Sequence, residues 1–207
     1  MKNNPSWETE NILVRYIGLH GIAQGLEQVV LAARELEPLD NIQIELIGDG
    51  PEKQALVQMS KELEANNIRF RDPVPHQQVR ALLNAADICL VPLKIRLTGA
   101  VPSKLYEAMA VGKPVVLVAD GEAARIVEDY ACGLVVKPGD IRGLSAAIRT
   151  LASNPETRRR MGANGRRAAV AYFDRAEIAG RFADFLRVRT DSSNGSQLHG
   201  RSIPPAD

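Results

Sequence analysis

Short apolar runs alternate along the chain with longer segments in which apolar residues recur at helical spacing. Apolar runs of a few residues, bounded by Gly, Pro or Asp, are typical of buried β-strands. The pattern predicts strands at Ile12–Ile17, Ile42–Ile47, Ile68–Phe70, Ile88–Val91, Val115–Val118 and the short run LVV at 134–136.

The segments between these runs have the pattern of helices that bury one face. In the first of them, Leu26, Val29, Val30, Ala33 and Leu36 form a single apolar stripe. By the same criterion, and from the Gly and Pro residues that end helices, further helices are predicted at 52–66, 77–85, 102–111, 120–133, 141–152, 154–170 and 174–188.

This alternation predicts an α/β fold, a Rossmann-like doubly wound parallel sheet with helices on both faces and strands buried on both sides. The expected organisation is a polar N-terminal segment at 1–11, one domain at 12–188, and a Ser/Gly/Pro-rich tail at 189–207. Such a composition buries little apolar surface, so the tail is predicted to be disordered.

Composition narrows the class of protein. The chain has 207 residues, 45% of them hydrophobic, which is enough for one sizeable core. Its net charge of +1 argues against a nucleic-acid partner. Cys89 and Cys132 are the two cysteines, and no disulfide or metal site is expected. No signal peptide or membrane-spanning run is visible, so a soluble, cytoplasmic domain is expected.

Three loops that contain glycine directly follow predicted strands. They are Gly18–Gly25, Gly48–Pro51 and the loop LTGAV before Pro102. Ligands of open parallel sheets bind outside the carboxyl ends of the strands, so we expect the three loops to meet at one rim. Glycines there expose backbone N–H groups to an anion. Each loop alone is also consistent with a plain connection, and the glycine spacing does not match the dinucleotide fingerprint.

Side chains near these loops supply candidate chemistry. Lys104 and Glu107 lie three residues apart on one predicted helix and therefore share a face. A cation at a helix N-terminus and a carboxylate one turn later suit a ligand with phosphate and hydroxyl groups. The alternative is a surface ion pair between the two. His20 is a candidate donor to phosphate or is solvated. The loop around Val74 offers its backbone to a base edge or is a rigid connection.

A basic helix near the C-terminus has two interpretations. Its arginines form either a solvated helix face or a surface attracted to anionic lipid headgroups at the inner face of a membrane. These arginines are Arg158, Arg159, Arg160, Arg166 and Arg167.

In this order, the motifs resemble the C-terminal half of the GT-B glycosyltransferases of the family-4 type, also called group 1. The resemblance covers about 12–186. It is carried by YIGLHGIAQGLEQV, ELIGDGPEKQAL, PSKLYEAMAVGKPVV, GEAARIVEDYACGLVVKPGD and the closing YFDR…F…FL. It implies a single GT-B half-domain plus C-terminal helices. Within the family, the chain is most similar to transferases of amino or deoxy sugars in bacterial capsule and O-antigen assembly.

The resemblance implies that the donor is a nucleoside diphosphate sugar and that no metal or other cofactor takes part.

 The expected donor is a UDP-linked sugar, whose glycosyl group is transferred with retention of anomeric configuration. Glu107 matches the second of the family's paired glutamates and would hold the ribose hydroxyls, whereas the first falls on Gly99. Many relatives carry a basic pair in the first glycine-rich turn, where this chain has His20 and Gln24 instead. For catalysis we expect His20, Lys104 and Glu107 to act, and for donor binding we expect Gly18, Gly21, Gly48, Gly50, Val74, Ser103, Lys104 and Glu107.

The family's acceptor site lies in an N-terminal domain, so we expect this chain to need that domain or a partner chain and to be inactive alone. The alternative is a non-catalytic nucleotide-sugar-binding or partner-docking module of a split enzyme, because Gly99 replaces a family carboxylate. A nucleotide-sugar epimerase would need acidic residues that we do not find in the sequence.

Overall fold

The computed structural model describes residues 11–94 and 101–194. Its strands form one parallel sheet in the order β3-β2-β1-β4-β5-β6. This confirms the predicted doubly wound fold. The strands are β1 (Ile12–Ile17), β2 (Ile42–Ile47), β3 (Ile68–Arg71), β4 (Ile88–Pro92), β5 (Val115–Val118) and β6 (Gly133–Val136).

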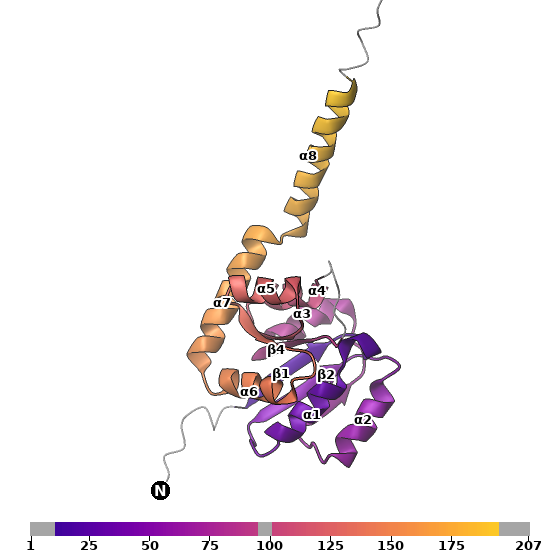
Figure 1. Cartoon of the computed structure of the whole chain (residues 1–207), viewed down its shortest axis with the longest axis vertical. Helices are drawn as coiled ribbons and strands as arrows, with labels where there is room; N and C mark the ends of the chain where they lie inside the picture. The colour runs from indigo at the N-terminus through magenta and orange to yellow at the C-terminus, as the bar shows by residue number, and fades with distance from the viewer. Residues whose placement is uncertain (1–10, 95–100, 195–207) are drawn as a thin grey trace, which may run out of the picture. The chain divides into compact units, whose positions relative to one another are not determined.

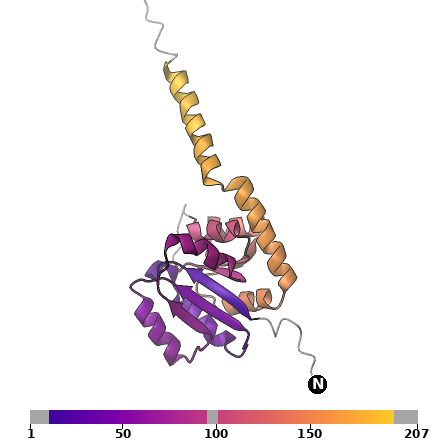
Figure 2. The same cartoon turned by 180° about the vertical axis from the view of Figure 1, so that it is seen from behind.

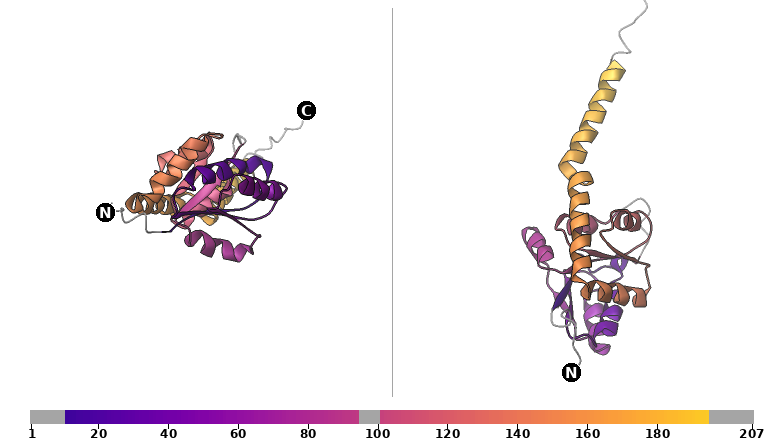
Figure 3. Two further views of the ribbon diagram at one scale, coloured as in Figure 1. Left: turned by 90° about the horizontal axis from the view of Figure 1, so that it is seen from below. Right: turned by 90° about the vertical axis from the view of Figure 1, so that its left-hand side faces the viewer.

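Helices cover both faces of the sheet (Figures 1 and 2). Helices α1, α2 and α6 lie on one face, and α3, α4 and α5 lie on the other (Figures 1 and 3). Their bounds are α1 (Glu27–Leu36), α2 (Lys53–Glu62), α3 (His76–Asn84), α4 (Ser103–Ala110), α5 (Glu122–Asp129) and α6 (Ile141–Ala152). A short 3₁₀ helix, η2 (Ile22–Gln24), precedes α1.

Two helices end earlier than predicted, and the backbone explains both. Glu64 and Ala131 adopt left-handed conformations, with φ of 54° and 45°. A residue in this conformation ends a helix, because the chain leaves the helical path there. Helix α2 therefore ends at Glu62 and α5 ends at Asp129, before their predicted limits near Asn66 and Gly133.

The chain divides into two compact units, residues 1–170 and 171–207. Helix α7 (Pro155–Tyr172) reaches the second unit, which contains α8 (Arg175–Asn194). We predicted one domain over 12–188 and disorder from residue 189, whereas α8 continues as a helix to Asn194. The exposed large apolar residues of α8 are Ile178, Phe182, Phe185 and Leu186. The predicted N-terminal segment up to residue 10, the tail beyond 194 and Gly99 lie outside the described residues.

Two arginines of α7 stabilise the ends of other helices. Arg158 is buried, and its Nη1 donates to the carbonyl oxygens of Leu151 and Ala152, each at 2.7 Å. Arg166 donates to the carbonyl oxygen of Ala110, the last residue of α4. Cations are favourable at helix C-termini, where carbonyl groups lack partners. The contact of Arg158 is buried and that of Arg166 is exposed, and both give part of the predicted basic surface a structural role.

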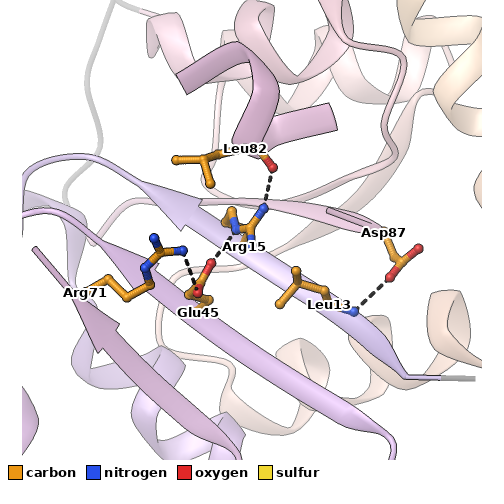
Figure 4. Close-up of polar contacts among 6 residues, drawn as sticks. All are labelled: Leu13, Arg15, Glu45, Arg71, Leu82 and Asp87. Atoms are coloured by element: carbon orange, nitrogen blue, oxygen red, sulfur yellow. Dashed lines mark hydrogen bonds and ion pairs between the residues drawn. The ribbon is translucent and has the colours of Figure 1, made fainter. Parts of the chain in front are cut away.

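A buried ion pair ties the first strands together under α3 (Figure 4). Arg15 on β1 lies 2.5 Å, Nε to Oε2, from Glu45 on β2, and Arg71 on β3 lies 3.1 Å from the other oxygen of Glu45. Arg15 also donates to the carbonyl oxygen of Leu82 on α3. Because these contacts join three strands and a helix, they hold α3 against the sheet, and residues at the start of α3 reach the site described below.

Strands β1, β2 and β3 end at the same level. Ile17 pairs with Ile47, and Ile47 pairs with Arg71. The sheet order reverses between β1 and β4, which is the point where open α/β sheets form a crevice at the carboxyl ends of their strands. The fold therefore brings the loops after β1, β2, β3 and β4 to one edge.

Candidate functional site

The loop after β1 is held against the neighbouring loop and α4. The N–H of Gly18 donates to the carbonyl oxygen of Ile47 at 2.9 Å, and Tyr16 Oη donates to the carbonyl oxygen of Leu19 at 2.7 Å. A Cβ on Gly18 would lie 2.1 Å from Cε of Lys104. Glycine is therefore required at this position for Lys104 to lie over the loop.

The loop after β2 packs directly on the first loop. A Cβ on Gly48 would lie 1.8 Å from the carbonyl oxygen of Gly18, and one on Gly50 would lie 2.4 Å from that of His20. The N–H of His20 also donates to the carbonyl oxygen of Asp49 at 2.8 Å. The glycines of the second loop thus allow the two backbones to meet, which confirms that these two predicted loops converge.

Helix α4 supplies the charged groups of the site. We predicted Pro102 as the first helical residue, whereas the helix begins at Ser103 and Pro102 is its N-cap, with ψ of 131°. No side chain caps the helix. Within the described part of the chain, no ion pair or hydrogen bond joins Lys104 to Glu107. The Lys104 Nζ instead lies 5.8 Å from the centre of the Tyr16 ring. A cation over an aromatic face is favourable, so Tyr16 helps to place this ammonium group.

These elements enclose a cavity of about 400 Å³. Five of the residues predicted for donor binding line it, and they come from the first two loops, the loop after β3 and α4. They are Gly18, Gly48, Val74, Lys104 and Glu107. The remaining lining residues are Ile17, Leu19, Ile47, Asp49, Pro73, His76 and Val79. Of the loop before Pro102, residues 95–100 lie outside the described part, and the described Val101 does not line the cavity.

The other predicted residues lie beside this cavity and do not line it. Gly21 is buried as the N-cap of η2, Gly50 packs on the first loop, and Ser103 is exposed at the start of α4. Sequence reasoning did not select His76 and Val79. Val79 lies in the helix predicted at 77–85, and His76, which directly precedes that range, is the first residue of α3. The signal that could have found them is the position of this helix, because its first turn directly follows the loop around Val74.

His20 is in the interior, where neither predicted alternative places it. The side chain is fully buried, and its ring lies beside those of Tyr16 and Phe70, with centroid distances of 6.1 and 6.3 Å. Neither ring nitrogen has a partner among the described residues. Burial lowers the pKa of His20 and the charge of Lys53 lowers it further, while Asp49 acts in the opposite direction. The neutral imidazole is therefore favoured.

The cavity has a distinct chemical layout. Lys104 brings a positive charge next to the uncapped N-terminus of α4, where backbone N–H groups favour anions. Glu107, one turn along the helix, adds a carboxylate that accepts hydrogen bonds. Pro73, Val74 and Val79 add apolar surface. This arrangement suits a ligand that combines an anionic group, hydroxyl groups and a flat or apolar part.

Among the residues described, no group of three His, Cys, Asp or Glu side chains is placed to hold a metal ion. No helix in the described part is both long and apolar enough to cross a bilayer. A larger hollow of about 910 Å³ runs along α2 and β3 and shares Pro73 and Val74 with the cavity, but neither α4 nor the first glycine loop reaches it.

Comparison with known proteins gives consistent matches. The family model described as glycosyl transferases group 1 matches residues 1–168. The lipopolysaccharide core biosynthesis glycosyltransferase LpsD of Rhizobium meliloti is 28% identical over 163 residues, which cover 79% of this chain and 46% of that protein. The chain thus spans less than half the length of the curated relatives it matches.

Solved structures agree on the fold. HepE of Anabaena, crystallised in complex with UDP, superposes with a TM-score of 0.78 at 22% identity, covering 87% of this chain and 50% of that one. Sucrose-phosphate synthase of Thermosynechococcus elongatus superposes with a TM-score of 0.76 at 27% identity, covering 92% of this chain and 47% of that one. In each case, the similar region is about half of the larger chain.

Proposed function

From the premise that this chain belongs to the group 1 glycosyl transferases, we propose that its cavity binds the nucleoside diphosphate sugar from which a glycosyl group is transferred. The proposed donor is UDP-linked, and the transfer retains the configuration of the anomeric carbon. The observation that supports this proposal most directly is the meeting of Gly18, Gly48, Val74, Lys104 and Glu107 at one cavity, although they come from four different loops and helices.

The diphosphate is assigned to the end of the cavity that holds Lys104. Negative charge develops on this leaving group as the bond to the anomeric carbon breaks. Lys104 and the N–H groups at the start of α4 are already in place to stabilise that charge. A fixed donor set of this kind needs no reorganisation during the reaction.

The nucleoside is assigned to the other lining residues. Glu107 accepts hydrogen bonds from the ribose hydroxyls, and a charged acceptor makes such bonds stronger than neutral ones. Pro73, Val74 and Val79 give an apolar wall for the base. HepE was crystallised with UDP and with UDP-glucose, which supports a uridine donor. A mannosyltransferase relative is named as GDP-mannose-dependent, so guanosine donors belong in the test.

In this proposal, the side chain of His20 does not contact the donor, and His20 contributes to the site only through its backbone. Its buried ring does not line the cavity, but its backbone joins the first two loops. The catalytic role predicted for it would require the ring to turn toward the diphosphate. We therefore assign the charge stabilisation to Lys104 and α4.

The acceptor is proposed to bind outside this unit. The curated relatives are more than twice as long as the matched region, and their additional length can hold a second domain. We propose that transfer requires such a domain or a partner chain, and that the chain described by this sequence binds donor without turning it over.

Calorimetric titration of the full chain with UDP, GDP, ADP and dTDP tests the proposal. Saturable binding of one nucleotide, strongest for UDP, is the expected result. A turnover assay with UDP-sugars and co-expressed N-terminal domains then separates an enzyme from a non-catalytic binding module. Failure to bind any of the four nucleotides would refute the proposed function.

A further inference from the structure

Lys53 is the first residue of α2, where a positive charge opposes the helix dipole. The hydrogen bonds of its ammonium group account for a lysine at this position. The ammonium Nζ lies 2.9 Å from the carbonyl oxygen of Gly48, 3.2 Å from that of Arg71 and 2.8 Å from Oδ1 of Asp72. A lysine ammonium has three N–H donors, so all three can be used here.

The three acceptors belong to two different loops. Gly48 follows β2, and Asp72 follows β3 after the final residue of that strand, Arg71. The N–H of Gly48 donates to the carbonyl oxygen of Arg71 at 3.1 Å, after the last paired position of the two strands. Lys53 therefore binds both chain segments next to this last backbone bond between them.

Both loops contribute lining residues to the cavity. Gly48 and Asp49 come from the loop after β2, and Pro73 and Val74 come from the loop after β3. Lys53 itself does not line this cavity, and its side chain is only 17% exposed. It therefore contacts the backbone of the two loops without being one of the groups that face the cavity.

We infer that Lys53 is a positioning residue, whose ammonium group holds the two loops at the separation that the nucleoside requires. Hydrogen bonds from a charged donor are stronger than neutral ones, and two of the three reach backbone oxygens, those of Gly48 and Arg71, which no side-chain substitution removes. The inference rests on the proposed function, because it assigns the space between the two loops to the nucleoside.

The substitution Lys53→Met tests this role, since it keeps the length of the side chain and removes its donors. UDP is titrated directly and uridine by competition, in the full chain. Because Lys53 does not line the cavity, both affinities are expected to fall by the same factor, about tenfold, as a small misplacement of binding groups produces. In the same assay, Lys104→Met is expected to weaken UDP alone.

Matched variants complete the experiment. Lys53→Arg keeps the charge and donors and is expected to restore most of the affinity. Asp72→Asn keeps an acceptor oxygen but removes the negative charge of a side chain that is 96% exposed, and it is expected to leave both affinities close to those of the unaltered chain, because surface ion pairs contribute little. Hydrogen exchange of the backbone amides in the two loops, measured without ligand, should be faster in Lys53→Met; these amides are those of Gly48, Asp49, Gly50, Glu52, Asp72 and Val74.

Several results would overturn the inference. A loss confined to UDP would show direct phosphate contact, and a lower melting temperature with unchanged affinity and exchange would show a role in stability alone. If Lys53→Met does not fold, Lys53→Gln, which retains an N–H donor, is expected to give a smaller loss for both ligands. Binding of neither ligand by the unaltered chain would instead refute the proposed function on which the inference rests.

Discussion

Gly48 and Gly18 are in such close contact that a Cβ on Gly48 would lie 1.8 Å from the carbonyl oxygen of Gly18. Gly48 also has φ of 147°, a conformation that other residues rarely adopt. The contact joins the loops after β1 and β2 at the cavity, so the close approach of two backbones, not a side chain, sets this part of the site.

The substitution Gly48→Ala is expected to lower the free energy of unfolding by about 3 kcal/mol, from backbone strain and the forced movement of the Gly18 loop. Denaturant unfolding measures it. The matched control is Gly180→Ala in α8, where a Cβ meets no atom within 4 Å and the helix should tolerate or gain from alanine. Equal effects of the two substitutions would contradict the close contact.

Glu107→Gln is expected to weaken UDP binding by ~1.5–3 kcal/mol, because a neutral amide replaces the charged acceptor of the ribose hydroxyls. Calorimetry of the full chain measures the change. Glu128→Gln, on the exposed surface of α5, serves as the control and should leave binding unaltered. A loss below a few tenths of a kcal/mol for Glu107→Gln would remove the carboxylate from the proposed site.

Lys104→Met is expected to reduce affinity for UDP by roughly ten- to a hundredfold, the range of a lost charge-assisted contact, and to leave uridine binding unchanged. Competition titrations with the two ligands give both values. Tyr16→Phe keeps the aromatic ring beneath Lys104 and removes the hydroxyl that donates to Leu19, so it should reduce UDP affinity much less. An equal loss for uridine and UDP in Lys104→Met would place the ammonium away from the diphosphate.

His20 makes the stability of the fold depend on pH. Its pKa is lowered in the folded state, mainly by burial, so the unfolded chain binds a proton more readily. The contribution of His20 is therefore fully present above its unfolded pKa of about 6.5 and is lost as pH falls below that value. Denaturant unfolding between pH 5 and 8 should show this loss, His20→Phe should reduce it, and the exposed His76→Gln should retain it.

Glu45→Gln is expected to lower the free energy of unfolding by about 3–5 kcal/mol, because it leaves Arg15 buried without its counter-charge. The side chains of Arg15 and Glu45 are only 6% and 13% exposed, so water compensates little. The exposed Glu128→Gln again serves as the control in denaturant unfolding. A change within about 0.5 kcal/mol, typical of surface substitutions, would contradict a structural role for this pair.

Much of the fold was predictable because its signals are local. The bounds of β1, β2, β5 and α6 agree with the apolar pattern. Parallel strands then bring their carboxyl-terminal loops to one edge, which is why the loops of Gly18 and Gly48 could be assigned to one rim before the structure was known. The sequence pattern did not predict where α2 and α5 end, since both stops depend on single residues with positive φ.

The sequence by itself determined the succession of strands and helices along the chain, the rim at which the loops meet, and the charges that α4 brings to that rim. Only the tertiary structure decided that His20 is buried, that Lys104 lies over Tyr16 and does not pair with Glu107, and that Lys53 joins two loops. The physical reason is distance along the chain. Periodicity and helix stops are set by near neighbours, whereas the burial and the partners of a side chain depend on residues that only the folded sheet brings together.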